Sequence, residues 1–226
     1  MTNFFITGTD TGVGKTRVTI TIMAALKNAG FDVVGMKPVA SGAQMINGKL
    51  INDDAKLIQK QCSHSVSYEA VNPFVFRFPA APHIAAELEH KSIDHNQIIK
   101  NYHALDSASD ILIMEGIGGW EISLNEEYTL PDLVESLNLA VILVVGLRLG
   151  CINHAILTAQ SIAGKGIKLC GWVSNHLDKE YLTPDQTIMA LKKRINCPHI
   201  ADLPYNPNFD LDNLSTKVSP AFISQI

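Results

Sequence analysis

The chain has no excess of positive charge, which limits the partners it could have. Its 226 residues include 18 lysines and arginines against 22 aspartates and glutamates, giving a formal net charge of −4 at pH 7. A protein that binds nucleic acid or an anionic membrane surface needs clustered positive charge. We therefore expect neither kind of partner.

Cysteines are few, and long apolar runs are lacking. Cys62, Cys151, Cys170 and Cys197 show no C-x-x-C motif and no metal-ligand spacing, so we interpret them as reduced thiols. The longest apolar run, 139–146, is too short to cross a bilayer, and the N-terminus has no basic leader. These features predict a cytoplasmic protein.

No repeat, low-complexity tract or linker interrupts the chain, so we expect one domain over residues 1–226. The composition, 46% hydrophobic and 18% charged, suits a globular core. Short apolar runs alternate with helical patterns, which predicts a doubly wound α/β fold, with a mainly parallel sheet between helices on both faces. The expected strands are 3–7, 32–39, 110–116, 139–146, 167–175 and 199–203, and the clearest helices are 16–28, 153–163 and 184–194.

A glycine-rich loop follows the first expected strand, in the segment GTDTGVGKT at residues 8–16. The usual phosphate-binding pattern, G-x-x-x-x-G-K-[ST], would place a glycine at Thr9, but the nearest glycine is Gly8. The loop is therefore one residue longer than the pattern. Gly12 and Gly14 allow backbone conformations that turn N–H groups toward an anion.

The end of this loop has the residues that phosphate chemistry needs. Lys15 could reach the β- and γ-phosphates of a nucleotide, and the hydroxyl of Thr16 could bind Mg²⁺. The N-terminus of the following helix adds a partial positive charge. The alternative is a glycine-rich turn that happens to precede a helix. The strand–loop–helix context favours the phosphate loop.

Charged residues also follow the second expected strand. Lys37 precedes Pro, Val, Ala, Ser and Gly and could place a cation beside the phosphates, although taken alone a solvated surface lysine is the favoured interpretation. A helix begins near 52–55, where we expect one of Asp53 and Asp54 to be the N-cap. The other aspartate could then bind a metal ion, because carboxylates are preferred Mg²⁺ ligands.

Two further strand ends carry candidate site residues. Glu115 closes an apolar run at the position of a Walker-B carboxylate, and a buried charge there needs a partner, which disfavours an ordinary glutamate at the edge of the sheet. The segment 150–154 begins a helix and could form a second anion site from its N-terminal amides. Cys151 in that segment has no neighbouring base in the sequence, so we expect a small packed residue.

The last two strand ends could line a nucleotide base. Asn175 could bind a purine edge, and its neighbour His176 stands where the guanine-reading N-K-x-D motif has lysine, which favours ATP over GTP. His176 by itself is more typical of a packed or solvent-facing histidine. The segment 204–207, Pro-Tyr-Asn-Pro, could contact a base or ribose, or could be an ordinary turn.

Taken together, these motifs resemble those of the dethiobiotin synthetase family, in which the lengthened phosphate loop is a family trait. The resemblance extends in order to about residue 175. The matching strings are TGTDTGVGKT, KPVASG, NDDA, VNPFVF, PHIAA, MEGIGGW, VILVVGLRLGCINHA and GWVSN.

The resemblance implies a ligase of biotin biosynthesis that closes a ring. It would combine 7,8-diaminononanoate, CO₂ and ATP into dethiobiotin, with Mg²⁺ as cofactor, through a carbamate and a carbamic–phosphoric anhydride. Lys37 and Lys15 would be catalytic, and Thr16, Asp54 and Glu115 would surround Mg²⁺. ATP would contact Gly12, Val13, Gly14, Lys15, Thr16, Arg17, Asp54, Glu115, Asn175, His176, Pro204, Tyr205 and Asn206.

The resemblance also implies a homodimer with the substrate at the subunit interface. Thr11, Lys37 and Ser41 would contact the reacting end of the substrate. A second subunit would hold the distal carboxylate of the substrate through its own Gly150, Cys151, Ile152 and Asn153.

Three other readings compete with this one. A switch ATPase of the partitioning or septum-positioning type would carry a lysine early in the phosphate loop, but residues 9–13 include none. An amidotransferase-type synthetase usually has a glutaminase domain, for which 226 residues leave little room. An inactive binding module is disfavoured by the intact set of Lys15, Thr16, Lys37, Asp54 and Glu115.

Overall fold

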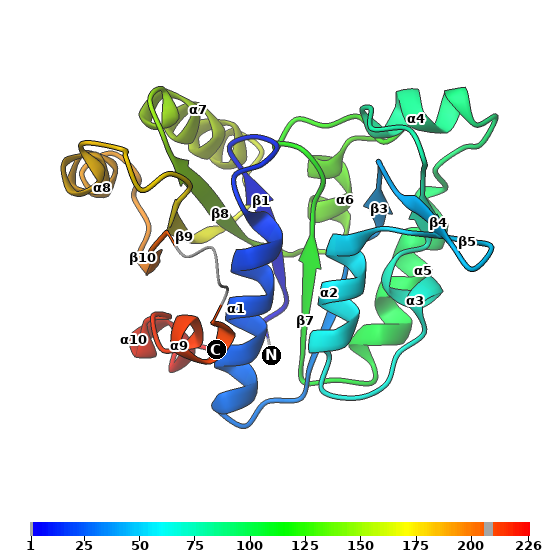
Figure 1. Ribbon diagram of the computed structural model, residues 1–226, viewed down its shortest axis with the longest axis horizontal. Helices are drawn as coiled ribbons and strands as arrows, with labels where there is room; N and C mark the ends of the chain where they lie inside the picture. The colour runs from blue at the N-terminus through cyan, green and yellow to red at the C-terminus, as the bar shows by residue number, and fades with distance from the viewer. Residues whose placement is uncertain (1, 206–209) are drawn as a thin grey trace.

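The computed structural model, which describes residues 2–205 and 210–226, has a six-stranded parallel sheet at its centre. The strands are β1 (Phe4–Gly8), β2 (Val33–Met36), β7 (Ile111–Glu115), β8 (Ala140–Leu147), β9 (Leu169–His176) and β10 (His199–Leu203). Their order across the sheet is β10-β9-β8-β1-β7-β2, and every neighbouring pair is parallel (Figure 1). The six expected strands are all present.

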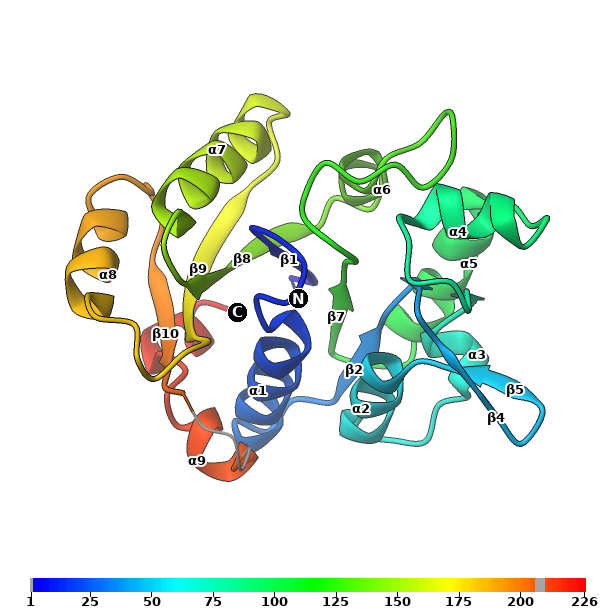
Figure 2. The ribbon, with the colours of Figure 1, turned by 45° about the horizontal axis from the view of Figure 1, so that its top comes forward.

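Helices cover both faces of the sheet. They are α1 (Lys15–Asn28), α2 (Asp53–Gln61), α3 (Tyr68–Val71), α4 (Pro82–Leu88), α5 (His95–Asp106), α6 (Leu130–Ser136), α7 (Cys151–Gly164), α8 (Pro184–Lys192), α9 (Leu211–Ser215) and α10 (Pro220–Ile223). Figure 2 shows α6 and α7 on one side of the strands and α1 and α2 on the other. The α/β class predicted from the sequence is therefore confirmed.

The strands read as nearly continuous apolar runs because both faces of the sheet are covered. All eight residues of β8 are buried, and Phe5 and Ile6 of β1 have no exposed surface. Burying a large apolar side chain contributes about 1.5–3 kcal/mol, so these strands supply much of the folding free energy. They also form a rigid base for the loops at their carboxyl ends.

Several predicted boundaries differ from the structure. The expected strand 32–39 is two strands, because β2 ends at Met36 and β3 (Val39–Ala40) pairs with β6 (Phe74–Val75) in a separate small sheet. Pro38 between them has no N–H to donate to a ladder. The predicted helix 153–163 begins two residues earlier, at Cys151, and the strand 167–175 is shifted to Leu169–His176.

An antiparallel hairpin of β4 (Gln44–Ile46) and β5 (Lys49–Ile51) was not expected from the sequence. Its turn is Asn47-Gly48, with φ angles of 50° and 79°. Asn-Gly is the dipeptide that favours tight hairpin turns, so a local signal existed. Within the described ranges, no helix has both the length and the apolar character that a membrane crossing requires.

Candidate active site

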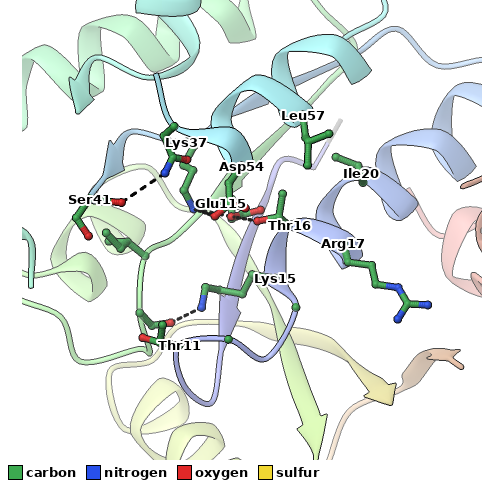
Figure 3. Close-up of a pocket in the computed structure, with 15 residues that line it drawn as sticks. Thr11, Lys15, Thr16, Arg17, Ile20, Lys37, Ser41, Asp54, Leu57 and Glu115 are labelled. Atoms are coloured by element: carbon green, nitrogen blue, oxygen red, sulfur yellow. Dashed lines mark hydrogen bonds and ion pairs between the residues drawn. The ribbon is translucent and has the colours of Figure 1, made fainter. Parts of the chain in front are cut away.

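The topology of the sheet brings three distant segments together. Strand β7 lies between β1 and β2, so its last residue, Glu115, lies between the phosphate loop and Lys37. Figure 3 shows Thr16, Lys37, Asp54 and Glu115 close together. A cavity of about 470 Å³ opens here, and the predicted site residues that line it are Thr11, Gly12, Gly14, Lys15, Thr16, Arg17, Lys37, Ser41, Asp54 and Glu115.

The phosphate loop has the backbone shape expected from its glycines. Gly12 and Gly14 have φ angles of 73° and 87°, in the left-handed region that glycine adopts without strain. Gly14 is the N-cap of α1 and has no side chain to cap the helix. No side chain caps the first-turn amides of α1, so these amides are available to an anion.

The side chain of Lys15 is hydrogen-bonded to the backbone of two neighbouring loops. Its Nζ atom donates to the backbone oxygens of Asp10, at 2.9 Å, and Gly118, at 2.5 Å. Burial, together with the positive charge of Lys37, lowers the pKa of Lys15 to about 8. A phosphate group entering the cavity would offer this buried amine a stronger, charged partner.

Lys37 is a buried residue, so the interpretation of this lysine as a solvated surface residue is wrong. Only 4% of its side chain is exposed, and its Nζ lies 2.6 Å from Oε1 of Glu115 and 3.7 Å from Oδ2 of Asp54. Burial by itself would lower the pKa of Lys37, but the two carboxylates raise it above its ordinary value. The side chain is therefore an ammonium group at neutral pH.

Glu115 is fully buried and has partners on both carboxylate oxygens. Lys37 and the hydroxyl of Thr16, at 2.8 Å, donate to Oε1, and the hydroxyl of Thr19 donates to Oε2 at 2.7 Å. The expectation that this charge needs a partner is confirmed. Thr19 was not singled out in the sequence, although its place one helical turn after Thr16 puts both hydroxyls on one face of α1.

Asp54 lies in the first turn of α2, with its side chain half exposed beside the cavity. Neither aspartate is the N-cap, so that expectation is wrong. Asn52 has the extended backbone of an N-cap, and its side-chain oxygen accepts the N–H of Ala55 at 3.1 Å. Asp53 is exposed and does not line the cavity.

A chain of hydrogen bonds ties the start of α2 to Lys37. The hydroxyl of Tyr68 accepts the N–H of Asn52 at 2.8 Å and donates to Oδ1 of Asn72 at 2.9 Å. The amide of Asn72, in turn, donates to the backbone oxygen of Lys37 at 2.7 Å. Asn52, the N-cap of α2, is therefore connected to Lys37 through Tyr68 and Asn72, a link that spacing along the sequence does not reveal.

The residues expected near a nucleotide base meet at Arg17. Asn175 is buried, with its Nδ2 donating to the backbone oxygen of Val13 at 2.9 Å and its Oδ1 accepting from Arg17 at 3.2 Å. Arg17 also donates to the backbone oxygen of Pro204 at 2.6 Å. The ends of β9 and β10 are thus fastened to the start of α1.

The other expected base contacts are more exposed. His176 is partly buried, and its Nε2 lies 3.0 Å from Oδ1 of Asp202. Tyr205 is 45% exposed. Asn206 lies outside the described residues. Asn175, His176, Pro204 and Tyr205 do not line the 470 Å³ cavity, so the structure does not bring these four residues to the acidic and basic cluster.

The expected anion site at the start of α7 is also separate from this cavity. Gly150 is the N-cap with a φ angle of 90°, and Cys151 is buried, as expected of a packed residue. Ile152 and Asn153 are exposed on the surface. None of these residues lines the cavity within the same chain.

The chain is similar to a known protein family and to named relatives over nearly its whole length. The AAA domain family matches residues 2–212. An ATP-dependent dethiobiotin synthetase BioD from Nitrosospira multiformis is 44% identical over 97% of this chain and 96% of its own length, and one from Aromatoleum aromaticum is 41% identical over 89% and 90%.

The fold is also shared with a solved structure whose sequence is much less similar. The MinC:MinD cell division protein complex of Aquifex aeolicus has a chain that is 14% identical, with a TM-score of 0.57 over 100% of this chain and 89% of that chain, and this likeness shows a shared fold alone. The identity to dethiobiotin synthetases, by contrast, extends over nearly the whole sequence. This chain belongs to the dethiobiotin synthetase family.

Proposed function

We propose that the chain performs the reaction of its family, the ATP-dependent formation of dethiobiotin in biotin biosynthesis. The substrates are 7,8-diaminononanoate, CO₂ and ATP, and the products are dethiobiotin, ADP and phosphate. The observation that carries this proposal is the cluster of Lys15, Thr16, Lys37 and Glu115 around one cavity, in a chain similar to dethiobiotin synthetases over nearly its full length.

The reaction has three chemical steps. One amine of the substrate adds to CO₂ and loses a proton, which gives a carbamate. A carbamate oxygen attacks the γ-phosphorus of ATP, and ADP leaves, which gives a carbamic–phosphoric anhydride. The second amine attacks the carbamate carbon, the cyclic urea closes and phosphate is released. No protein nucleophile is required, because phosphoryl transfer depends on positioning and charge.

The two buried lysines suit the middle step. The carbamate and the γ-phosphate are both anions, and they repel strongly at close range in a site of low dielectric constant. Lys37, kept charged by Glu115, would offset the carbamate charge, while Lys15 would contact the β- and γ-phosphates. Thr11 and Ser41, which line the same cavity, would hold the reacting end of the diamine.

The residues around Glu115 fit a magnesium ion. Thr16, Asp54 and Glu115 offer one hydroxyl and two carboxylates, the hard oxygen donors that Mg²⁺ prefers in phosphate sites. The ammonium of Lys37 already lies close to both carboxylates, so this position attracts a cation. When bound, the ion would neutralise charge on the phosphates of ATP.

The base of ATP would lie near Asn175 and His176, beside Pro204, Tyr205 and Asn206. Arg17 supports this placement, because it joins Asn175 and Pro204 to the helix that begins at the phosphate loop. The phosphate loop and the base site would then be parts of a single rigid surface. Asn175 would contact the base only through a face that Val13 and Arg17 leave open.

A homodimer would complete the substrate site. The exposed start of α7, from Gly150 to Asn153, offers helix N-terminal amides for the distal carboxylate of the substrate, but these residues do not reach the cavity of their own chain. A second copy would supply them.

The single domain and the cytoplasmic location expected from the sequence remain predictions.

The first test is phosphate release from ATP and Mg²⁺ with and without the diamine and bicarbonate. Release that needs both, with one cyclic urea formed per phosphate, is the expected result. Release that ignores the diamine would instead favour a switch ATPase with a protein partner. Analytical ultracentrifugation of the same sample would test the dimer.

A further inference from the structure

Thr16 and Thr19, one turn apart on α1, each donate a hydrogen bond to a different carboxylate oxygen of Glu115. Thr16 donates its hydroxyl to Oε1 at 2.8 Å, and Thr19 donates to Oε2 at 2.7 Å. Residues three apart lie on the same face of a helix, which is why both can reach one side chain on β7. The two threonines differ in their surroundings, however, and this difference separates their roles.

Thr16 lines the cavity, whereas Thr19 does not. The side chain of Thr19 has no exposed surface, so it cannot touch a nucleotide, a metal ion or the substrate. Any effect of Thr19 on the reaction must pass through the residue that it holds. That residue is Glu115, whose Oε1 is left to Thr16 and Lys37.

The hydroxyl of Thr19 has a choice of acceptors. It lies 3.0 Å from the backbone oxygen of Lys15 and 2.7 Å from Oε2 of Glu115. A hydroxyl has a single proton to donate, and a bond to an ionised carboxylate is shorter and stronger than one to a backbone oxygen. The proton of Thr19 therefore goes to Glu115.

We propose that Thr19 is a positioning residue for the reaction, which fixes the Glu115 carboxylate so that Oε1 faces the magnesium site. This inference rests on the role proposed above for Glu115. Without the hydroxyl, Oε2 would be buried without its donor, and the carboxylate would turn to recover a hydrogen bond. Oε1 would then no longer be held in place for Thr16, Lys37 and the metal ion.

Thr21 provides a matched control on the same helix. It is also fully buried, and its hydroxyl donates to the backbone oxygen of Arg17, four residues earlier, at 2.7 Å. Thr19 has the equivalent contact with Lys15 but adds the one to Glu115. Thr19→Val and Thr21→Val therefore make the same chemical change in the same kind of position, and only the first removes a donor from Glu115.

The experiment measures binding, not turnover. The full-length protein is titrated with a non-hydrolysable ATP analogue by calorimetry at a series of Mg²⁺ concentrations. Loss of a residue that orients a metal ligand typically weakens metal binding 10–100-fold, so Thr19→Val should raise the half-saturating Mg²⁺ concentration by about tenfold or more. Thr21→Val should leave it unchanged, and Thr19→Ser, which keeps the hydroxyl, should restore the wild-type value.

The arms of the experiment separate two failures. If Glu115→Gln leaves the Mg²⁺ dependence unchanged, the proposed metal site is wrong and the inference falls with it. If Glu115→Gln shifts the dependence but Thr19→Val matches Thr21→Val, the role of Thr19 alone is wrong. Should Thr19→Val not fold, Thr19→Ala removes the same hydroxyl without adding bulk and is judged by the same outcomes.

Discussion

The Nζ atom of Lys37 lies 2.6 Å from Oε1 of Glu115, and the exposed fractions of the two side chains are 4% and 0%. Burying such an ion pair is costly because both charges lose their water. Removing one partner strongly destabilises the folded protein, because the other charge is then left buried and uncompensated. The Lys37–Glu115 pair lies next to Asp54, and all three residues line the cavity. In the proposed reaction, this pair would keep a cation where the carbamate and the γ-phosphate approach each other.

Lys37→Ala should lower kcat by about 10²–10³-fold, which is the typical effect of removing one preorganised electrostatic group, while the Kd for ATP changes much less. The reason is that its contacts strengthen as charge develops in the transition state. Steady-state kinetics and calorimetry with an ATP analogue measure the two effects. Equal losses in kcat and in ATP affinity would contradict this role, and Lys49→Ala, in an exposed pair with Glu69, is the control.

Asp54→Ala should raise the Mg²⁺ concentration that gives half-maximal phosphate release, and Glu115→Ala should do the same. Both changes remove a carboxylate from the cavity, and we expect shifts of at least about tenfold, the lower end for residues that support a metal site. Asp53→Ala is the matched control, because Asp53 is adjacent but exposed and away from the cavity. An unchanged Mg²⁺ dependence would remove the mutated residue from the metal site.

Gly14→Ala should abolish binding of an ATP analogue, whereas Gly12→Ala should retain it. A Cβ atom at Gly14 would lie 2.1 Å from Nδ2 of Asn175, while one at Gly12 has nothing within 4 Å. Both positions have positive φ, so both variants bear the strain of a left-handed alanine, about 1–2 kcal/mol. Calorimetry and thermal melts of the two proteins measure binding and stability. Similar binding by both would show that the contact with Asn175 does not shape the loop.

His199 should make the folded protein sensitive to mild acid. Burial, aided by Lys192, lowers the pKa of His199 from its ordinary 6.5 to about 4, and its ring packs on Trp172 with centroids 4.2 Å apart. Between these pH values the unfolded chain binds a proton that the folded chain does not. The free energy of unfolding should therefore fall as the pH drops from 6.5 to 4, by up to about 1.4 kcal/mol per pH unit from this group.

His199→Phe keeps an aromatic ring against Trp172 and removes the titrating group. Denaturant unfolding of both proteins at several pH values between 4 and 7 is the measurement. The variant should show a flatter decline in acid than the wild-type chain. Parallel pH profiles for the two proteins would show that His199 is not the group responsible.

Local signals predicted the elements that depend on local physics. The six buried strands read as apolar runs, and the phosphate loop was evident from its glycines and from Lys15 and Thr16. Two local predictions were wrong: the N-cap of α2 and the single strand over residues 32–39. At the start of α2, Asn52 takes the N-cap that either aspartate could have formed, and at Pro38 an apolar run is divided between two sheets.

The sequence by itself determined the fold class, the phosphate loop and the family. Apolar periodicity, the positions of the glycines and the family's motifs can each be recognised within a few consecutive residues. Only the tertiary structure decided that Lys37 is buried against Glu115, that Thr19 holds the same carboxylate and that Tyr68 connects α2 to Lys37. These contacts join residues far apart in the chain, and the two at Glu115 exist because parallel pairing places β7 between β1 and β2. Burial and partner choice follow from that order of strands.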